Sequence, residues 1–322
     1  MTVYPWHQPL WQQFVNLWQQ QRLAHAILMS GAKGLAKTDL ALNMAKFSLC
    51  LAPSISAACG QCHSCELFAA DAHPDHLLIE PEEAGKTIKI DQIRALKDKQ
   101  SLTANISAWK TVVVHPAHKM TANASNSLLK LLEEPQPQTL LILVSSQPQQ
   151  LPVTIRSRCQ LWPMLSPAPA EIERWLKEQG IKISEKQLHQ LTPIAKGAPL
   201  MLQQMLESRL DLLVEQLQSD MQKLMQGNAN PMQMQINWQQ NDLLTVMHIL
   251  QYDLRNRLIK QPEALEAGIL WQILDCIQIT IKLVSSSNNY NKTLLIEDFM
   301  VSVMRICRSS QTIKPPLSRV SL

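Results

Sequence analysis

Long apolar runs are absent from this sequence of 322 residues. Hydrophobic residues make up 46% of the chain, yet none of its apolar runs reaches the about 18 residues that a membrane-spanning helix needs. The first residues, MTVYPWHQPLWQQF, also lack the charged-then-apolar order of a secretory signal. We therefore expect a cytoplasmic protein without a membrane partner. At about 150 residues per domain, the length predicts two or three compact units.

A large excess of positive or negative charge is also lacking. Charged residues make up 17% of the chain, and 30 Lys and Arg against 26 Asp and Glu give a formal net charge of +4. The basic residues are scattered along the sequence and form no stripe. The composition therefore does not require a nucleic-acid partner.

Short apolar runs alternate with helical patterns between Ala26 and Pro163. The runs are nearly all apolar, which is typical of parallel strands that helices cover on both faces. After about residue 166 we find only amphipathic helical patterns, so we predict an α/β core followed by an all-α part, with boundaries near 165 and 207. The predicted strands are 26–30, 77–80, 87–90, 111–114, 140–145 and 159–163.

The all-α part carries several local signals. Ser184 and Gln187 have the spacing of a capping box, which predicts the start of a helix. Long helices are expected over 210–225 and 264–284. Residues 227–235, GNANPMQMQ, predict a loop between helices because they contain Gly, Asn and Pro.

The segment 31–38, GAKGLAKT, follows the predicted strand 26–30 and precedes a helical pattern. A P-loop has the pattern G-x-x-x-x-G-K-[ST], in which backbone N–H groups cradle phosphates, the Lys reaches the β- and γ-phosphates and the hydroxyl holds Mg²⁺. Because Ala36 stands where the pattern has a glycine, the match is partial, and ATP binding by this chain stays an open question. The candidate nucleotide-binding residues are Gly31, Gly34, Lys37 and Thr38.

Acidic residues are missing where a P-loop ATPase needs them. In such enzymes a later strand ends in carboxylates that hold Mg²⁺ and help to polarise the attacking water. The predicted strand 111–114 runs instead into His115 and Pro116, and neither supplies a carboxylate. We therefore expect no ATP hydrolysis at this chain's own site. We interpret His115 and His118 as ordinary loop histidines.

Four of the seven cysteines have the spacing C-x₈-C-x₂-C-x₂-C. Four thiolates complete the tetrahedral coordination of Zn²⁺ and leave no open position, so this spacing predicts a structural zinc site and not a catalytic one. The predicted ligands are Cys50, Cys59, Cys62 and Cys65. Cys159, Cys276 and Cys307 lie among apolar residues and are interpreted as core residues.

Arg158 belongs to the tripeptide Ser157-Arg158-Cys159, just before the predicted strand 159–163. An arginine near the edge of such a core can reach the nucleotide site of a neighbouring subunit and stabilise the charge that develops on the γ-phosphate. The guanidinium suits this role because its charge is permanent and its planar fork meets phosphate oxygens in pairs. Taken alone, an arginine in a loop is usually a solvated residue. The context of Arg158 favours the catalytic role in trans, and this role is our prediction.

Several motifs together resemble the clamp-loader subunits of bacterial DNA polymerase III, which are AAA+ proteins. These motifs are GAKGLAKT, the cysteine spacing, NSLLKLLEEP at 126–135 and Ser157-Arg158-Cys159. The resemblance extends from the opening YPWHQP through HPD at 73–75 to NKTLLIEDFMVSVMRI near the end of the sequence. Motor subunits of this family keep an intact P-loop and an acidic motif. The sequence is similar to the family's stator type, which lacks them, and its segment 195–199, AKGAP, also lacks the arginine with which a motor senses nucleotide.

The resemblance implies a domain order and a set of partners. It implies an AAA+ core over 1–165 with a zinc module at 50–65, a helical lid over 166–207 and an α-helical collar over 208–322. The implied partners are motor subunits of the gamma/tau type and a delta subunit in a hetero-oligomeric ring. Through this ring the chain would take part in loading the sliding clamp onto primer-template DNA. It would belong to the DNA-directed DNA polymerase III holoenzyme without ATPase activity of its own.

Two segments of the predicted core allow structural and functional interpretations. Ser145 and Ser146 end the strand where AAA+ proteins place a residue that senses the γ-phosphate, and we interpret them as a strand-end cap. The roles of the charges in 126–135 stay open between a solvated face and a subunit interface. The leucines of that segment have helical spacing and are interpreted as core: Leu128, Leu129, Leu131 and Leu132.

Two other functions are considered. An active AAA+ motor subunit of the same complex would hydrolyse ATP as a purified chain. A zinc-dependent DNA-binding protein would use residues 59–65 directly and lose its salt-dependent DNA binding with a chelator. The second alternative has weak support because few basic or aromatic residues adjoin the cysteines, namely Lys46, Phe47, His63 and Phe68.

Overall fold

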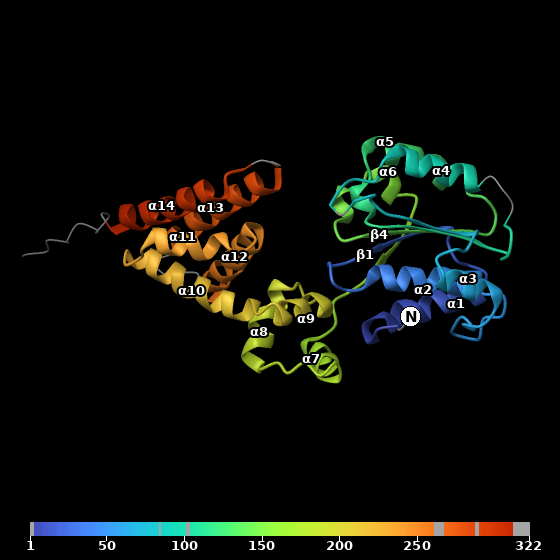
Figure 1. The fold of residues 1–322 in the computed structure, drawn as a ribbon, viewed down its shortest axis with the longest axis horizontal. Coiled ribbons are helices and arrows are strands. Elements are labelled where there is room, and N and C mark those ends of the chain that lie inside the picture. The colour runs from blue at the N-terminus through green and yellow to red at the C-terminus, as the bar shows by residue number, and fades with distance from the viewer. Residues whose placement is uncertain (1–2, 84, 101–103, 261–266, 287–289, 312–322) are drawn as a thin grey trace, which may run out of the picture. The chain divides into compact units, whose positions relative to one another are not determined.

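The computed structural model describes residues 3–83, 85–100, 104–260, 267–286 and 290–311 (Figure 1). The chain forms two compact units. We call the first the α/β unit, which comprises Met1–Lys182 and Ala195–Gln203. We call the second the helical unit, which comprises Ile183–Ile194 and Gln204–Leu322. The predicted division at 165 and 207 differs in its bounds and stays a prediction.

A five-stranded parallel sheet forms the centre of the α/β unit, with the strand order β2-β3-β4-β1-β5. Every residue of β4 is buried, as expected for an apolar strand in the middle of a covered parallel sheet. The α/β core is therefore confirmed, and five of the six predicted strands exist. They are β1 (Ala26–Ser30), β2 (His76–Ile79), β3 (Lys110–Val114), β4 (Thr139–Ser145) and β5 (Gln160–Pro163).

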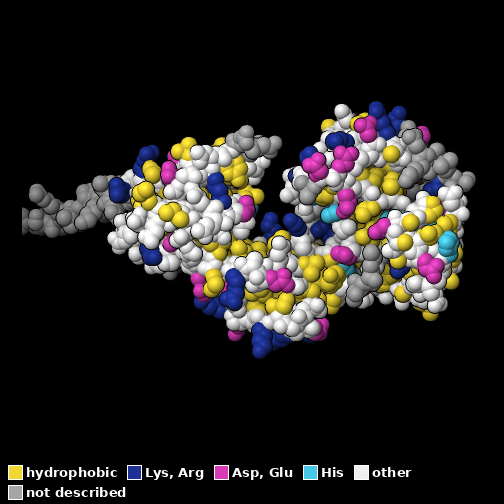
Figure 2. Space-filling view, viewed as in Figure 1, with side chains coloured by type: hydrophobic (Ala, Val, Ile, Leu, Met, Phe, Trp, Pro, Cys, Tyr) yellow, Lys and Arg dark blue, Asp and Glu magenta, His cyan; other side chains and the backbone are white. Residues whose placement is uncertain are grey.

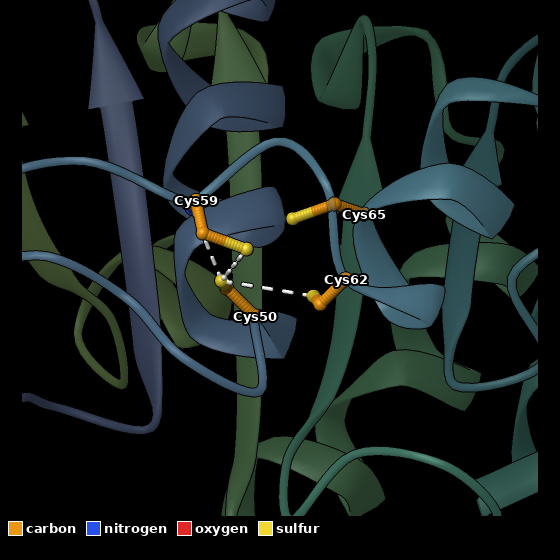
Figure 3. Close-up of side chains that lie close together, drawn as sticks. All are labelled: Cys50, Cys59, Cys62 and Cys65. Atoms are coloured by element: carbon orange, nitrogen blue, oxygen red, sulfur yellow. Dashed lines mark hydrogen bonds between the residues drawn. The ribbon is translucent and has the colours of Figure 1, made fainter.

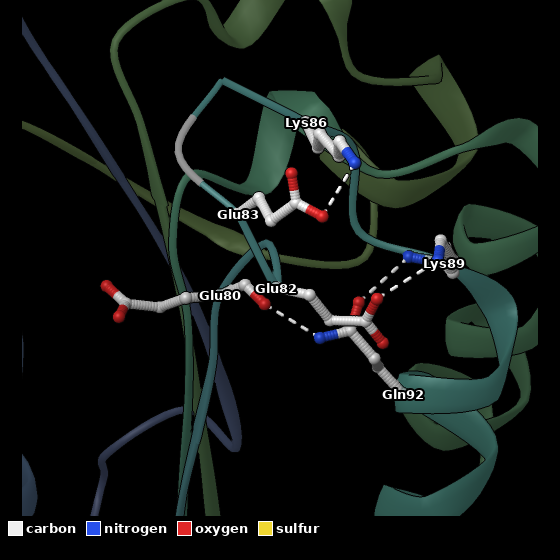
Figure 4. Close-up of polar contacts among 6 residues, drawn as sticks. All are labelled: Glu80, Glu82, Glu83, Lys86, Lys89 and Gln92. Carbon is white, nitrogen blue, oxygen red and sulfur yellow. Dashed lines mark hydrogen bonds and ion pairs between the residues drawn. The ribbon is translucent and has the colours of Figure 1, made fainter.

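The predicted strand 87–90 is wrong. Ile88 makes a single isolated bridge to Met120, and helix α4 (Ile90–Gln100) begins two residues later. The side chain of Gln92, in the first turn of α4, caps the start of this helix. Its Oε1 accepts a hydrogen bond of 3.0 Å from the backbone N of Lys89, and its Nε2 donates one of 2.7 Å to Glu80 O (Figure 4). The side-chain cap competes with strand pairing and favours the helix.

Helices cover both faces of the sheet. In Figure 1, α1, α2 and α3 lie on one side of it and α4, α5 and α6 on the other. The buried core on the second side includes Leu28, Val114, Leu128 and Leu143. Apart from α8 (Glu185–Ile194), the remaining elements of the first 207 residues are η1 (Pro5–His7), α1 (Gln8–Gln19), α2 (Lys37–Leu49), α3 (His63–Ala69), η2 (Ala117–Lys119), α5 (Ala122–Glu133), η3 (Pro148–Gln150), α6 (Val153–Arg156), α7 (Pro169–Glu178) and α9 (Pro199–Glu207).

The helical unit contains only helices among its described residues. The predicted capping box is present, because Ser184 N donates to Gln187 Oε1 (3.0 Å) and Gln187 N donates to Ser184 Oγ (3.2 Å). The loop predicted over 227–235 is wrong in its second half, since Pro231 occupies the first turn of α11. The helices are α8 (Glu185–Ile194), α10 (Leu210–Gln226), α11 (Pro231–Gln239), α12 (Leu243–Lys260), α13 (Ala267–Ser286) and α14 (Lys292–Gln311).

Helix α13 is unusually apolar. Its residues 267–285 have a mean hydropathy of 1.4 and are long and apolar enough to cross a membrane, judged by length and composition only. Among the described helices it is the one that passes this test. Ile273 and Ile277 of α13 are buried, and the helix packs against α12 and α14. Because core helices of soluble proteins pass the same test, α13 is weak evidence for a membrane span.

Candidate functional site

The P-loop-like segment connects β1 to α2 at the carboxyl edge of the sheet, where open α/β sheets bind ligands. Ala36 adopts the left-handed conformation with a φ of 55°, which a glycine would adopt with less strain. Gly34 is in tight contact with the start of α9: Leu200 N donates to Gly34 O (3.2 Å), and a Cβ added to Gly34 would lie 2.8 Å from Met201 N. The structure thus brings together the four predicted nucleotide-binding residues: Gly31, Gly34, Lys37 and Thr38.

The polar groups of this loop are largely satisfied by the chain itself. Lys37 Nζ donates a hydrogen bond of 2.6 Å to Ala32 O within the loop, and the residue is only 6% exposed. Burial lowers the pKa of Lys37 to about 8. Trp6 Nε1 and His7 Nε2 both donate to Leu35 O, at 3.0 and 2.8 Å. The lysine that reaches phosphates in other P-loops therefore closes its own loop here.

Two histidines follow β3 at the same edge of the sheet. Burial, and then the nearby charge of Lys37, lower the pKa of His115, while burial, Lys119 and Lys37 lower that of His118. Both imidazoles are therefore neutral at pH 7, and neutral imidazole is a poor ligand for Mg²⁺. His118 Nδ1 lies 3.0 Å from Ser145 Oγ at the end of β4. The P-loop lysine, both histidines and this serine thus gather at one edge, as the strand order requires.

Ser145 caps the end of its strand. Its Oγ accepts a hydrogen bond of 3.1 Å from the backbone N of Gln147, and the side chain is fully buried. The interpretation of this serine as a strand-end cap is therefore confirmed. The leucines of α5 are core residues as predicted, since Leu128 and Leu132 are buried and Leu129 and Leu131 pack against them.

Arg158 lies on the surface, between α6 and β5. Its guanidinium makes an ion pair of 2.6 Å with Glu133 Oε1 and donates a hydrogen bond of 3.0 Å to Thr154 O. The side chain of Arg158 is 37% exposed and that of Glu133 is 48% exposed. An ion pair this exposed contributes no more than about 1 kcal/mol. Arg158 is thus accessible and weakly held, and its described contacts do not include the P-loop.

The four predicted zinc ligands converge on one point (Figure 3). Cys50 Sγ lies 3.5 Å from Cys59 Sγ and 3.9 Å from Cys62 Sγ, and all four sulfurs lie within 4.8 Å of one another. Zn–S bonds of about 2.3 Å in a tetrahedron place sulfurs about 3.8 Å apart. The sulfurs are too far apart for disulfides and have the spacing of a metal site. The cluster can therefore bind a metal ion.

The thiols of this cluster differ in acidity. Burial raises the pKa of Cys50 and that of Cys65, the latter to about 12. Burial acts in the same direction on Cys62, but hydrogen bonds from the backbone N–H groups of Leu51 and Cys65 lower its pKa to about 6. A bound divalent cation favours the thiolate form of every ligand. The cluster therefore gains its full ligand set only together with a metal.

A buried network beside the cluster was not predicted as functional. Ser64 Oγ donates to Leu49 O (2.7 Å) and lies 2.9 Å from His73 Nε2. His73 Nδ1 accepts from Asp75 N (3.1 Å). Ser64 has one proton to donate, so His73 Nε2–H is the donor to it. The network joins the neighbours of two ligands, since Leu49 precedes Cys50 and Ser64 precedes Cys65. The HPD motif at 73–75 is the sequence feature that includes His73, but it does not indicate that His73 bonds to Ser64.

The parallel sheet with a P-loop after β1, together with a helical unit, defines an AAA+ type of P-loop protein. A family model described as "DNA polymerase III, delta subunit" matches residues 6–167, half of the chain, and the chain belongs to this family.

Known relatives agree with this assignment. DNA polymerase III subunit delta' of Pseudomonas aeruginosa is 37% identical over 203 residues, which are 63% of this chain and 61% of the relative. The subunit of the same name from Escherichia coli is 32% identical over 199 residues, 62% of this chain and 59% of the relative. The matched region thus spans about three fifths of these relatives. The predicted resemblance to the clamp-loader family is confirmed.

A solved structure gives a weaker similarity. A DNA polymerase III gamma subunit-related protein from Thermotoga maritima has a TM-score of 0.47 and 20% identity, and the alignment covers 92% of this chain and 100% of that one.

Proposed function

We propose that the chain is a delta-prime stator subunit of a clamp loader, which does not hydrolyse ATP itself and supplies Arg158 to the ATP site of a neighbouring motor subunit. Family membership and the names of the relatives support the clamp-loader assignment. The proposed partners are gamma/tau-type motor subunits and a delta subunit in the ring, with the sliding clamp and primer-template DNA reached through the complex. The proposed compartment is the cytoplasm.

The observation that carries this proposal is the contrast between two cations of the α/β unit. Lys37 is buried and bonded to its own loop, whereas Arg158 is exposed and held by the half-exposed Glu133. A partner's phosphate can displace one exposed carboxylate at low cost, and a bidentate guanidinium suits that exchange. Hydrolysis by this chain is disfavoured because β3 ends at neutral histidines instead of carboxylates.

The test measures DNA-stimulated ATP hydrolysis by the reconstituted complex. We expect Arg158→Ala to lower the rate at least about tenfold, less than the loss of about 10³-fold or more in simple GTPases because the ring holds several ATP sites. Arg158→Lys keeps the charge but loses the fork and should also be impaired. Arg94→Ala is the matched control, since Arg94 is an exposed arginine of the same unit paired with an aspartate (3.5 Å to Asp91).

The interpretation of this test depends on assembly. Subunit association is measured in parallel by size-exclusion chromatography, and Arg158→Ala should leave it intact. An assembled Arg158→Ala complex with the same ATP turnover as the wild type would refute the proposed role of Arg158. A purified wild-type chain that hydrolyses ATP would support the motor alternative instead.

We further propose that the cysteine cluster holds a structural Zn²⁺. Four cysteines at tetrahedral spacing match the ligand set that structural zinc prefers, and no position is left for a substrate. Cys50 ends α2, while the other three ligands lie in the loop 51–62 and at the start of α3. The ion would therefore fix this loop against two helices. ATP is not proposed as a cofactor of this chain.

The helical unit is proposed to supply the collar that joins subunits in the ring, with residues 1–165 as AAA+ core, 166–207 as lid and 208–322 as collar. Exposed apolar side chains on α13 and α14 support this proposal, because apolar surface is commonly buried at interfaces, and Figure 2 shows hydrophobic side chains at the surface of this unit among polar ones. They include Trp271, Ile279, Leu294 and Val301. Failure of the chain to co-purify with motor and delta subunits would contradict it.

A further inference from the structure

A series of buried hydrogen bonds leads away from the cysteine cluster. Ser64 Oγ donates to Leu49 O and accepts from His73 Nε2, and His73 Nδ1 in turn accepts from Asp75 N. Ser64 is 1% exposed, and His73 and Asp75 are each 5% exposed, so water competes little for these bonds. We call the three bonds the buried path. The proposed function does not use it.

One end of the buried path lies beside the predicted metal ligands. Leu49 directly precedes Cys50, and Ser64 directly precedes Cys65. Helix α3, which carries Ser64, has only seven residues, and a helix this short is not stable without tertiary contacts. Cys50 and Cys65, once bound to a common metal, would join the end of α2 to α3. Ser64 Oγ and Leu49 O would thereby be held within hydrogen-bonding distance.

The other end of the buried path holds three consecutive backbone amides. The carboxylate of Asp75 accepts hydrogen bonds from the backbone N of Asn105 (2.7 Å), Ile106 (2.8 Å) and Ser107 (2.9 Å). Burial raises the pKa of Asp75, but these three bonds outweigh it and lower the pKa, so the carboxylate is ionised at pH 7. Asp75 O also accepts from Thr111 N in β3 (2.9 Å). Asp75 therefore fixes the segment that leads into β3.

We propose that the buried path couples the order of residues 105–107 to metal binding at the cysteine cluster. The inference rests on the proposed structural metal and does not depend on Arg158. Without the metal, α3 is released, Ser64 loses its bonds and the His73 ring is free to turn. Asp75 N then has no acceptor, and its carboxylate is no longer held in the orientation that the three amides need. The effect of the ion thus extends beyond its own loop to the amino edge of the sheet.

The first experiment compares the wild-type chain with bound Zn²⁺ and after removal of Zn²⁺ by a chelator. Deuterium exchange of individual backbone amides is followed by NMR at fixed pH and temperature. The amides of 105–107 should exchange about tenfold faster without Zn²⁺, which corresponds to the free energy of one buried hydrogen bond. Unchanged exchange at 105–107 overturns the proposal.

The control amide is that of Gln147, which also donates to a side-chain oxygen of the same unit, namely Ser145 Oγ (3.1 Å). Gln147 follows β4 at the carboxyl edge of the sheet, away from the amino edge where the buried path ends. Its exchange should change less than about twofold on removal of Zn²⁺. Equal acceleration of both sets of amides would mean that the metal stabilises the whole unit, and it would overturn the proposed coupling.

The second experiment interrupts the buried path and keeps all four cysteines. Ser64→Ala should still bind about one equivalent of Zn²⁺, yet its amides of 105–107 should exchange about tenfold faster than those of the wild type. Because the coupling is already broken, the chelator should add less than about twofold. If the chelator accelerates exchange as much in Ser64→Ala as in the wild type, the path does not run through Ser64 and the proposal is wrong.

Two further variants test the ends of the path. Asp75→Asn keeps the size of the side chain but loses the charge that strengthens its three bonds, so the amides of 105–107 should exchange faster with Zn²⁺ still bound. Ser54→Ala is the matched control, since Ser54 Oγ also donates to a backbone carbonyl near the cysteines (Ala57 O, 3.0 Å) but lies outside the path. It should keep the wild-type response to chelator. Circular dichroism checks that each variant folds.

The Zn²⁺ content, measured by mass spectrometry, separates this proposal from that of the structural metal. A wild-type chain that binds no Zn²⁺ would refute both. A chain that binds Zn²⁺ without any change at 105–107 would refute the coupling alone. None of these measurements involves ATP, so the ATPase test of Arg158 is unaffected by their outcome.

Discussion

Helix α2 carries a different kind of site at each end. At its amino end, the P-loop-like segment is closed by its own contacts, including the bond from Lys37 to Ala32 O. At its carboxyl end, four thiols lie within 4.8 Å of one another, which is the spacing of a metal site. The helix dipole favours anions at the first end and cations at the second. The lysine at the amino end is bonded within the chain, whereas the thiols at the carboxyl end are arranged to bind a cation.

This difference separates a loop whose polar groups are bonded within the chain from a cluster whose thiols have the spacing of a metal site. The loop keeps its first glycine, Gly31, and its lysine, and Ala36 adopts a left-handed conformation where the pattern has its second glycine. The lysine is nevertheless bonded to the protein, and His115 follows β3 where a P-loop ATPase has a carboxylate. The cysteine cluster keeps every ligand. If this comparison holds, removing a ligand at the carboxyl end of α2 should change metal content, while changes at the amino end should alter only stability.

The largest effect is expected for Cys62→Ser. The variant leaves three thiolates, and bound zinc should fall from about one equivalent to a small fraction, because structural zinc needs four ligands. Metal content is measured by mass spectrometry of the purified chain after dialysis. Cys276→Ser is the control, as Cys276 is a half-buried cysteine of α13. A wild-type chain without stoichiometric metal would contradict the proposed metal site at the carboxyl end of α2.

Gly34→Ala tests the closed packing at the amino end. A Cβ there meets Met201 N at 2.8 Å, and the φ of 89° is unfavourable for alanine, so we expect a loss of about 2–4 kcal/mol in the free energy of unfolding. Gly180→Ala is matched in φ (76°) but has open space around it, and it should cost about 1 kcal/mol. Urea denaturation measures both. Equal losses would mean that α9 does not hold the loop.

Ser64→Ala tests the buried network next to the metal ligands. The change leaves Leu49 O and His73 Nε2 without their partner, which should cost about 1–3 kcal/mol of stability. Ser54→Ala is the control, since its hydroxyl donates to a backbone carbonyl in an exposed loop, and it should cost less than about 0.5 kcal/mol. Urea denaturation is repeated with and without chelator. A loss seen only with metal bound would show that the network acts through the metal alone.

The smallest effect concerns the pH dependence of Lys37. Its pKa is lowered from 10.5 to about 8 in the folded state, so between these values the unfolded state binds more protons and stability rises with pH. Relative to Lys37→Met, the wild type should gain about 1 kcal/mol between pH 8 and 9. The difference between their urea denaturation curves at several pH values measures this gain. A difference independent of pH would contradict a buried, charged Lys37.

The sequence predicted the features that depend on local pattern. Apolar runs located five strands because parallel strands are buried on both faces, and the cysteine spacing located the whole cluster. The strand predicted at 87–90 is wrong because the cap from Gln92 to Lys89 N outweighs the preference of a short apolar stretch for a strand. In 227–235, Pro231 was interpreted as a loop residue although it starts α11.

Side-chain contacts between distant segments could not be predicted from the sequence. The contacts of Arg158 with Glu133 and of Trp18 with Trp109 join parts of the chain that only the folded sheet and helices bring together. Neither pair has a local signature, since charged and aromatic side chains are common on helix surfaces. The roles of these residues therefore depend on tertiary structure, whereas the ligand set of the cluster does not.

The ion pair between Arg158 and Glu133 has a consequence for nucleotide discrimination. If Arg158 enters a neighbour's ATP site, its guanidinium must exchange one carboxylate for phosphate oxygens. The terminal phosphate of ATP carries more negative charge close to the incoming arginine than ADP does, so it competes better with Glu133. The glutamate would thereby favour contact with a triphosphate and release after hydrolysis. Coupling between the neighbour's nucleotide state and this subunit would then depend on one surface carboxylate.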